Sequence, residues 1–257
     1  MSNSTCWTAA RNDWNEREMT TAMRPEATTP QTPTTRHFVA LRLAIEGDLR
    51  FLSHHDELRL LSRALLRAEW PLAWSEGFNP IPRITAPLPR GLGVASLADL
   101  FVIELAESWP AERLFDSLAV ALPQQCRLMR VDAGVAPKGL SARRVGYSIT
   151  LEERPAELST RIAAFLNERR VIAQRDFGPK KQPRPIDIRG FVEELTETDD
   201  GLWLTTNFDG QQSARPSEIL DAIGMAGHDA VATRERIEWT NEPEGRDTWP
   251  PTERTMS

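Results

Sequence analysis

Cysteine is scarce in this chain of 257 residues, which contains only Cys6 and Cys126. The two lie too far apart to form a metal-binding Cys-x-x-Cys pair, and Cys6 falls in a polar segment. A disulfide framework and a cysteine-ligated cluster are therefore excluded. The sequence predicts a protein that carries no cofactor of its own.

Long apolar runs are also missing. No stretch approaches the roughly 18 consecutive apolar residues that a membrane-spanning helix requires. The first residues lack the basic and then apolar pattern of a secretory signal. We therefore expect a cytoplasmic protein without a membrane partner.

An excess of positive charge is absent as well, since the formal net charge is −6 at pH 7. The long-range field of such a chain repels phosphate, so contact with a nucleic acid would need a local basic patch. Glycine-rich nucleotide motifs and Ser-His-Asp spacings are not found either. Dinucleotide-dependent enzymes and serine hydrolases are thus disfavoured.

The two ends of the chain differ in composition from its middle. Residues 1–36 are rich in Thr, Pro, Asn and Ser, and residues 241–257 combine three prolines with charges. Such segments cannot bury enough apolar surface to offset the loss of chain entropy on folding. We therefore predict disordered tails over 1–36 and 241–257. Hydrophobic residues make up 40% of the whole chain, which is typical of a folded globular protein.

Between the tails, the same rhythm of apolar residues occurs twice. In residues 37–135, apolar residues alternate as in a strand and then recur at helical spacing, and the sequence of these patterns is strand, helix, extended stretch, strand, helix, strand. The predicted segments are 38–45, 54–69, 71–85, 100–105, a helix opened by Pro110, and 127–131. This βαββαβ order is typical of ferredoxin-like folds.

Residues 141–240 repeat that order. A strand at 145–151 precedes a helix opened by Pro155, and Ile186 begins a strand that we expect to carry a bulge at Gly190. Asp200 and Gly201 indicate a hairpin turn, Pro216 opens a helix, and 231–237 supplies the last strand. The predicted fold is therefore α+β, with two tandem ferredoxin-like units.

Several ordered blocks resemble the radical-SAM-linked family, a domain of unknown function fused to or encoded beside radical SAM proteins. The blocks are FLSHHD at 51–56, SEGFNPIPR at 75–83, PLPRGLG at 87–93, DIR at 187–189 and SARP at 213–216. This chain departs from the family pattern at His55, usually apolar, and at Ile81, usually histidine. It also lacks the three-cysteine motif of radical SAM enzymes. The resemblance therefore implies a radical SAM partner.

His54 and His55 are the candidate catalytic residues. Ser53 fits the N-cap of the predicted helix and Asp56 its first turn, which places both histidines at the positive end of the helix dipole. That position disfavours protonation, so a neutral imidazole could act as a general base. A purely structural capping role explains Ser53 and Asp56 without any function. The pair is a poor zinc site because adjacent helical side chains diverge.

Arginines dominate the candidate RNA-binding residues. Arg59, Arg63 and Arg67 recur every four residues along one helical face, which could follow a phosphate backbone or form an ordinary solvated surface. A second possible RNA-binding surface is a groove between the two halves, which basic residues of both halves would line. Further candidates from the blocks and this groove are Phe78, Asn79, Arg83, Arg90, Arg189 and Arg215. Arg189 ends a basic run that also contains Lys180, Lys181 and Arg184.

Three functions remain open from the sequence. The first is an accessory protein that binds an RNA substrate, or a radical SAM partner, or both, without independent activity. The second is a metal-independent ribonuclease that uses His54 or His55 as its base. The third is a structural adaptor that joins its partner without touching nucleic acid.

Overall fold

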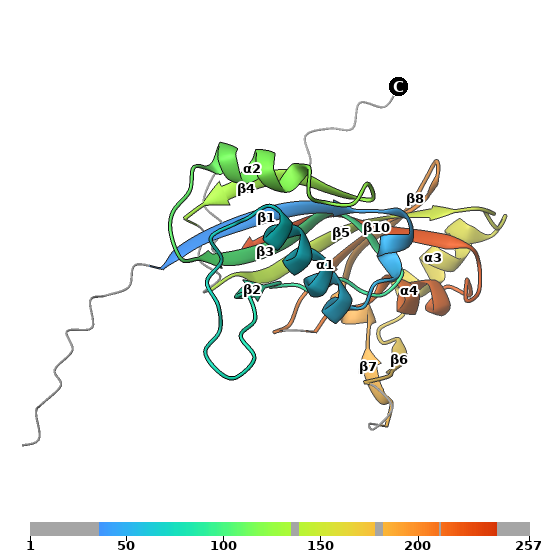
Figure 1. The fold of residues 1–257 in the computed structure, drawn as a ribbon. Helices are drawn as coiled ribbons and strands as arrows, with labels where there is room; N and C mark the ends of the chain where they lie inside the picture. Colours follow the sequence, from blue (N-terminus) through green and yellow to red (C-terminus); the bar gives the residue numbers. More distant parts are fainter. Residues whose placement is uncertain (1–35, 135–138, 178–181, 211, 241–257) are drawn as a thin grey trace, which may run out of the picture. The chain divides into compact units, whose positions relative to one another are not determined.

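A computed structural model describes residues 36–134, 139–177, 182–210 and 212–240 (Figure 1). The predicted tails, apart from Arg36, lie outside the described residues. Within these ranges the chain forms four α-helices, one large, mostly antiparallel sheet of eight strands, and a separate two-stranded sheet. The expectation of a mixed α+β protein is confirmed.

The first half of the chain follows the predicted order. Strands β1 and β3 lie side by side in antiparallel register, and β4 pairs with the other edge of β1. The short β2 pairs with β3, which gives the strand order β4-β1-β3-β2. The elements are β1 (His37–Ile45), the 3-10 helix η1 (Gly47–Phe51), α1 (His54–Arg67), β2 (Ile84–Thr85), β3 (Ala95–Leu105), α2 (Ala111–Ala119) and β4 (Cys126–Ala133).

The second half has the same strand order, with β10, β5, β9 and β8 in the places of β4, β1, β3 and β2. The predicted hairpin between β8 and β9 is present, but Thr198 pairs with Gly201, so its two turn residues are Asp199 and Asp200, one residue earlier than the expected Asp200-Gly201 turn. The elements are β5 (Ser141–Leu151), α3 (Leu158–Asn167), β6 (Ile172–Arg175), β7 (Arg184–Asp187), η2 (Arg189–Phe191), β8 (Val192–Thr198), β9 (Gly201–Asn207), α4 (Pro216–Ala222) and β10 (Ala230–Thr240).

The expectation of a bulge at Gly190 is wrong. Ile186 belongs to β7, which pairs with β6 in the separate small sheet, and the chain then makes the 3-10 turn η2 before β8 joins the large sheet. Ile188 is fully buried at the start of this turn, and its carbonyl accepts from the N–H of Phe191. The apolar residues at 186 and 188 therefore belong to two different structures, although their spacing imitates a single strand.

The two halves are joined through β3 and β10, which run parallel. Thr233 pairs with Ala95 and Arg234 with Ser96 at the beginning of β3, whereas β2 pairs with Ile103 and Val102 further along the same strand. Because β3 is eleven residues long, one edge of it serves both partners. The result is one continuous sheet.

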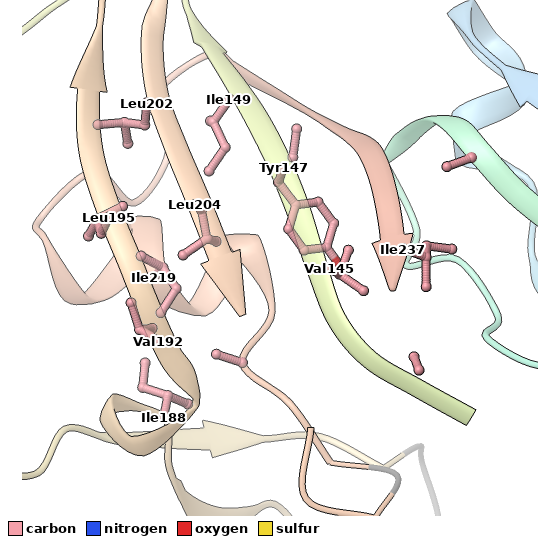
Figure 2. Close-up of a cluster of buried hydrophobic side chains, with 14 of the residues drawn as sticks. Val145, Tyr147, Ile149, Ile188, Val192, Leu195, Leu202, Leu204, Ile219 and Ile237 are labelled. Atoms are coloured by element: carbon pink, nitrogen blue, oxygen red, sulfur yellow. The ribbon is translucent and has the colours of Figure 1, made fainter. Parts of the chain in front are cut away.

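Two hydrophobic cores lie on this sheet. The first packs Leu61 and Leu65 of α1 and Leu114 of α2 against β1, β3 and β4. The second packs α3 and α4 against β5, β8 and β9, and Figure 2 shows Ile219 of α4 among the side chains of these strands. Ala98 and Leu100 of the first half belong to this second core. The halves thus share buried apolar surface as well as a sheet.

A candidate ligand-binding cavity and the flanking sites

A cavity of about 720 Å³ lies where the two halves meet. Its walls from the first half are the end of η1 and the loop before β3. Its walls from the second half are β5, the end of β6, the segment leading into α4, and β10. The lining residues are Arg50, Phe51, Leu88, Pro89, Arg90, Gly91, Leu92, Gly93, Val94, Tyr147, Arg175, Phe208, Ser213, Ala214, Arg215, Pro216, Ser217, Leu220, Ala230, Ala232 and Arg234. The volume is in the range of small-molecule sites.

Charge of one sign lines this cavity. Five of its residues are arginines, and none of the described lining residues is Asp or Glu. Three of these arginines are buried and meet carboxylates that lie behind the wall. The other two, Arg50 and Arg215, have no carboxylate partner within the described residues, so they supply the unbalanced positive charge.

Arg90 forms part of the wall with a side chain that is only 1% exposed. Its Nη2 atom donates to Oε1 of Glu57 on α1 at 2.9 Å, and its Nε atom donates to Oδ2 of Asp99 on β3 at 3.2 Å. The remaining donors bind the carbonyl oxygens of Leu49, Arg50 and Val94. All five N–H groups are used, so Arg90 fixes the cavity wall and is not the free groove residue that the sequence suggested.

Arg234, from the second half, binds Asp99 as well. Its Nη1 atom lies 3.1 Å from Oδ1 of Asp99 and also donates to the carbonyl of Leu88, while Nη2 donates to the carbonyl of Pro89. Asp99 therefore bridges one arginine from each half. The Nε atom of Arg234 is buried and has no acceptor among the described residues. Burial raises the pKa of the adjacent Tyr147 hydroxyl, and Arg234 opposes that rise.

Arg175 holds the opposite wall. It binds Glu218 of α4 through two parallel hydrogen bonds, Nε to Oε1 at 2.7 Å and Nη2 to Oε2 at 2.6 Å. The same Glu218 accepts from the backbone N–H of Arg215 at 2.9 Å, which closes the first turn of α4. A planar bidentate pair of this kind orients both partners. The segment that carries Arg215 is thereby set in place at the cavity rim.

Arg50 and Arg215 are the arginines that a ligand can reach. Arg215 is exposed, and the guanidinium carbon of Arg50 lies 4.5 Å from the centre of the Phe51 ring. Phe51 is itself 55% exposed, although it is large and apolar. An arginine over an aromatic ring keeps its N–H groups free for an anion, because the ring occupies its face and not its edge.

The chain from residue 39 to residue 220 matches the family described as "Uncharacterized protein conserved in bacteria (DUF2344)". The protein belongs to this family. No curated protein matches it. Among solved structures it is similar to a chain of a Cbf5-Nop10-Gar1 complex, with 11% identity and a TM-score of 0.41 over 77% of this chain and 48% of that chain. It is also similar to the acetolactate synthase small subunit from Thermotoga maritima, with 12% identity and a TM-score of 0.25 over 81% and 98% of the two chains.

In this DUF2344 protein, the predicted cap of α1 is present and places His54 and His55 in its first turn. Ser53 accepts from the backbone N–H of Asp56 at 3.3 Å. His55 is exposed, whereas Nδ1 of His54 is buried, has no hydrogen-bond partner among the described residues, and lies 4.0 Å from Oε2 of Glu57. Burial and then the neighbouring His55 lower the pKa of His54. The sequence attributed a lowered His54 pKa to the helix dipole, whereas burial is the main cause in the structure. Neither histidine lines the cavity.

The arginine row on α1 does not act as one surface. Arg59 pairs with Asp56 at 3.1 Å, and Nη2 of Arg67 donates to the carbonyl of Ala121 at 2.5 Å. Only Arg63, which is exposed, has no polar partner among the described residues. The sequence interpretation overlooked Asp56 because it lies one turn before the row. This face of α1 therefore offers one free guanidinium instead of three.

The long loop between α1 and β2 folds back on itself (Figure 1). Trp74 forms a bridge with Pro82, so Phe78 and Asn79 lie in the turn between them. Ser75 and Ile81 exchange hydrogen bonds near the tip, and Arg83 closes the base by donating to the carbonyl of Trp74. Nη1 of Arg83 also lies 3.6 Å from Oε2 of Glu104 on β3, so part of its guanidinium group already has protein partners. The ring of Phe78 is 99% exposed. This hydrogen-bonded loop therefore presents an aromatic ring to solvent, away from the cavity lining.

Arg189 also differs from the expectation of a groove residue. Its Nε and Nη2 atoms donate to the carbonyl of Leu166 at the end of α3, and Nη1 donates to the carbonyl of Val192. It therefore fastens η2 to the last turn of α3. Of the groove candidates, Arg90 and Arg215 do meet at the cavity, while Lys180 and Lys181 lie outside the described residues.

The sequence reasoning missed three arginines of the cavity, namely Arg50, Arg175 and Arg234. Arg175 and Arg234 occupy strands, where a charged residue is ordinarily assigned to the solvent face, and nothing in the local pattern signals their distant carboxylates. Arg50 directly precedes the block at 51–56, so its position beside Phe51 was the one available signal.

Metal ligands and reactive thiols were the remaining chemical possibilities in the described part of the chain. There, no cluster of three His, Cys, Asp or Glu side chains could hold a metal ion. Cys126 is buried on β4, and burial with the nearby Glu57 and Asp99 raises its thiol pKa to about 12. A thiol of that pKa is not a nucleophile near neutral pH. None of the helices described is long and apolar enough to cross a membrane.

Proposed function

We propose that this protein is an accessory RNA-binding module, built from two tandem ferredoxin-like units, that holds an RNA substrate at the cavity between its halves. The observation that carries the proposal is the lining of that cavity by arginines without a carboxylate, because two of them, Arg50 and Arg215, have no acidic partner within the described residues. Guanidinium groups recognise phosphate through paired, charge-assisted hydrogen bonds. In a chain of net charge −6, such a patch is the local attraction that an RNA needs.

The repeated strand order supports the tandem architecture. The first half has the order β4-β1-β3-β2 and the second the equivalent order β10-β5-β9-β8, each with its two helices in the same places along the chain. Such an order is typical of the split βαβ arrangement of ferredoxin-like folds, which supports this part of the proposal. The β6–β7 hairpin is then an insertion into the second unit.

A radical SAM protein is the proposed partner. This part of the proposal rests on the resemblance of the sequence blocks, three of which contribute to the cavity: Phe51 from the first, Leu88 to Gly93 from the third, and Ser213 to Pro216 from the last. If the partner carries the reactive centre, an RNA held at the cavity would be presented to it. The exposed Phe78 loop is a separate surface at which the partner could dock.

Binding of labelled single-stranded RNA, followed by fluorescence anisotropy, tests the RNA proposal. The double variant Arg50→Ala, Arg215→Ala should bind at least about 100-fold more weakly, since hydrogen bonds to charged groups contribute about 1.5–3 kcal/mol each. The slope of log K against log salt should fall by about 1.4, which is about 0.7 for each lost phosphate contact on a single strand. The matched control Arg59→Ala, Arg63→Ala removes the same charge from α1. Equal losses in both variants would show that RNA binding does not depend on the cavity.

A ribonuclease remains the second candidate, because His54 combines a lowered pKa with a buried Nδ1 that lacks a partner in the described structure. Incubation of labelled small RNA with wild type and with the double variant His54→Ala, His55→Ala tests it. Cleavage that disappears in the variant would support the enzyme. Absence of cleavage by wild type would remove this candidate.

The adaptor hypothesis makes a different prediction about the same partner. An adaptor complex should survive nuclease treatment during co-purification with the radical SAM protein, whereas an RNA-bridged complex should dissociate. Phe78→Ser should weaken a direct complex, because the ring is almost fully exposed and available for contact.

A further inference from the structure

The cavity has the size of a pocket for one small ligand and is too small to be a groove for a nucleic-acid duplex. Its volume of about 720 Å³ lies within the range of roughly 300–1,000 Å³ that encloses small molecules. A duplex would require a surface that extends along many phosphates. Whatever enters must therefore be a single unit, or the local part of a strand that has been separated from its neighbours.

We infer that this cavity recognises one nucleotide unit, with its phosphate held by Arg50 and Arg215 and its base stacked on Phe51 or Phe208. The inference deepens the proposed function and rests on it for the RNA source of that unit. The same chemistry is present in a free nucleoside monophosphate and in a single nucleotide of an RNA strand. The experiment below separates these two sources.

The phosphate subsite is inferred from which arginine N–H groups already bind protein acceptors and which do not. Arg90 uses all of its donors on protein acceptors, and Arg175 uses Nε and Nη2 on Glu218 and on the carbonyl of Ser213, which fixes the walls before any ligand arrives. Arg50 and Arg215 come from opposite halves and have no polar side-chain partner in the described structure. Arg234 adds a guanidinium that is 2% exposed and lines the same space, with an Nε–H that lacks an acceptor among the residues that the structure describes. Such a set accepts an anion and penalises a cation.

The base subsite follows from the aromatic rings. Phe51 from η1 and Phe208 from the end of β9 line the cavity from the two halves. The ring of Phe51 is 55% exposed, and the guanidinium carbon of Arg50 lies 4.5 Å from the ring centre. A large exposed phenyl ring with a guanidinium above it is the platform on which bases stack, independently of sequence. The combination of aromatic and cationic groups distinguishes a nucleotide from an isolated phosphate.

Isothermal titration calorimetry of the full chain tests the inference with four probes: adenosine 5′-monophosphate, adenosine, inorganic phosphate, and a single-stranded tetranucleotide. The monophosphate should bind at least tenfold more tightly than adenosine or phosphate alone. Arg215→Ala should weaken the monophosphate at least tenfold and leave adenosine within about twofold. Phe51→Ala should weaken the monophosphate and adenosine together but not phosphate. Arg63→Ala, an exposed arginine outside the cavity, should change none of them, and circular dichroism of each variant verifies folding.

The two sources and the two proposals give different results. If the tetranucleotide binds better than the monophosphate and displaces it, the unit belongs to a strand. If the monophosphate binds and RNA does not, the pocket serves a free nucleotide, and the proposed function fails while the pocket stands. If RNA binding depends on Arg50 and Arg215 but neither the monophosphate nor the tetranucleotide competes for the cavity, the one-nucleotide inference is overturned and RNA binding stands. Equal binding of phosphate and monophosphate would also overturn it.

Discussion

At the scale of single residues, Arg90 shows why a charged side chain can be structural although it lines a candidate binding site. Its five N–H groups meet two carboxylates and three carbonyl oxygens, so no donor remains for a ligand. Burial raises the pKa of Glu57, and the nearby Asp99 raises it further, against the opposing effect of Arg90. Arg90 thus binds two buried carboxylates with one guanidinium group.

Replacement of Arg90 should therefore be severe. Arg90→Met keeps much of the side-chain volume but leaves Glu57 and Asp99 without this partner, and breaking a buried pair in this way costs about 3–5 kcal/mol. Arg90→Lys should cost less, because it keeps the charge and loses donors. The free energy of unfolding in urea measures both, and Arg63→Met on exposed α1 surface should lie within about 0.5 kcal/mol of wild type. A loss below 1 kcal/mol for Arg90→Met would contradict the role assigned to this network.

His54 gives a prediction about pH at the same scale. Its pKa is lower in the folded chain than the ordinary value of 6.5, so the unfolded chain binds more protons as the pH falls through that range. The contribution of His54 to stability is thus present above pH 6.5 and is lost as the pH falls through the folded pKa. Urea unfolding from pH 7.5 to pH 5 should show a smaller loss of stability in His54→Gln than in wild type. An NMR titration midpoint for His54 at or above 6.5 would refute the premise.

At the scale of elements, local patterns predict what local forces determine. Helix α1 was predicted to begin at His54 because Ser53 is a capping residue and leucines follow at helical spacing, and it does begin there. The hairpin at Gly201 was likewise predicted from its own residues. The separation of β7 from β8 was not, because alternation within a few residues does not reveal which sheet a strand joins. The cavity escaped prediction for the same reason, since its arginines are paired with carboxylates far away in sequence.

The β8–β9 hairpin allows a matched test of two glycines. Gly201 has φ of +147°, and a Cβ atom there would lie 2.1 Å from the carbonyl oxygen of Ile149 on the neighbouring strand. Gly201→Ala should therefore destabilise the chain by more than about 1 kcal/mol, because the backbone of β5 or β9 must move. Gly190→Ala should change stability by less than about 0.5 kcal/mol, since no atom lies within 4 Å of the added methyl group. Thermal unfolding of the two variants would decide, and equal shifts in Tm would count against this register of the hairpin.

At the scale of the described molecule, the two halves are coupled by three independent features. Strands β3 and β10 pair in one sheet, Asp99 bridges Arg90 and Arg234, and Ala98 and Leu100 of the first half are buried in the core of the second. The cavity lies at this junction, so its geometry depends on the relative position of the halves. Coupling of this kind preorganises a site, because neither half can move without exposing apolar surface or separating buried charges.

The coupling predicts that the halves unfold together. Leu100 is 6% exposed, and Leu100→Ala should lower the global free energy of unfolding by about 2–5 kcal/mol, as for other buried leucines. Hydrogen exchange followed by mass spectrometry should then show equal loss of protection in β1 of the first half and in β5 and β9 of the second, because one cooperative opening exposes them all. Leu61→Ala, in the core of the first half, should reduce protection in both halves by the same mechanism. If β5 and β9 kept their protection while β1 lost it, the halves would be separate folding units, and the cavity between them would have to be formed by docking.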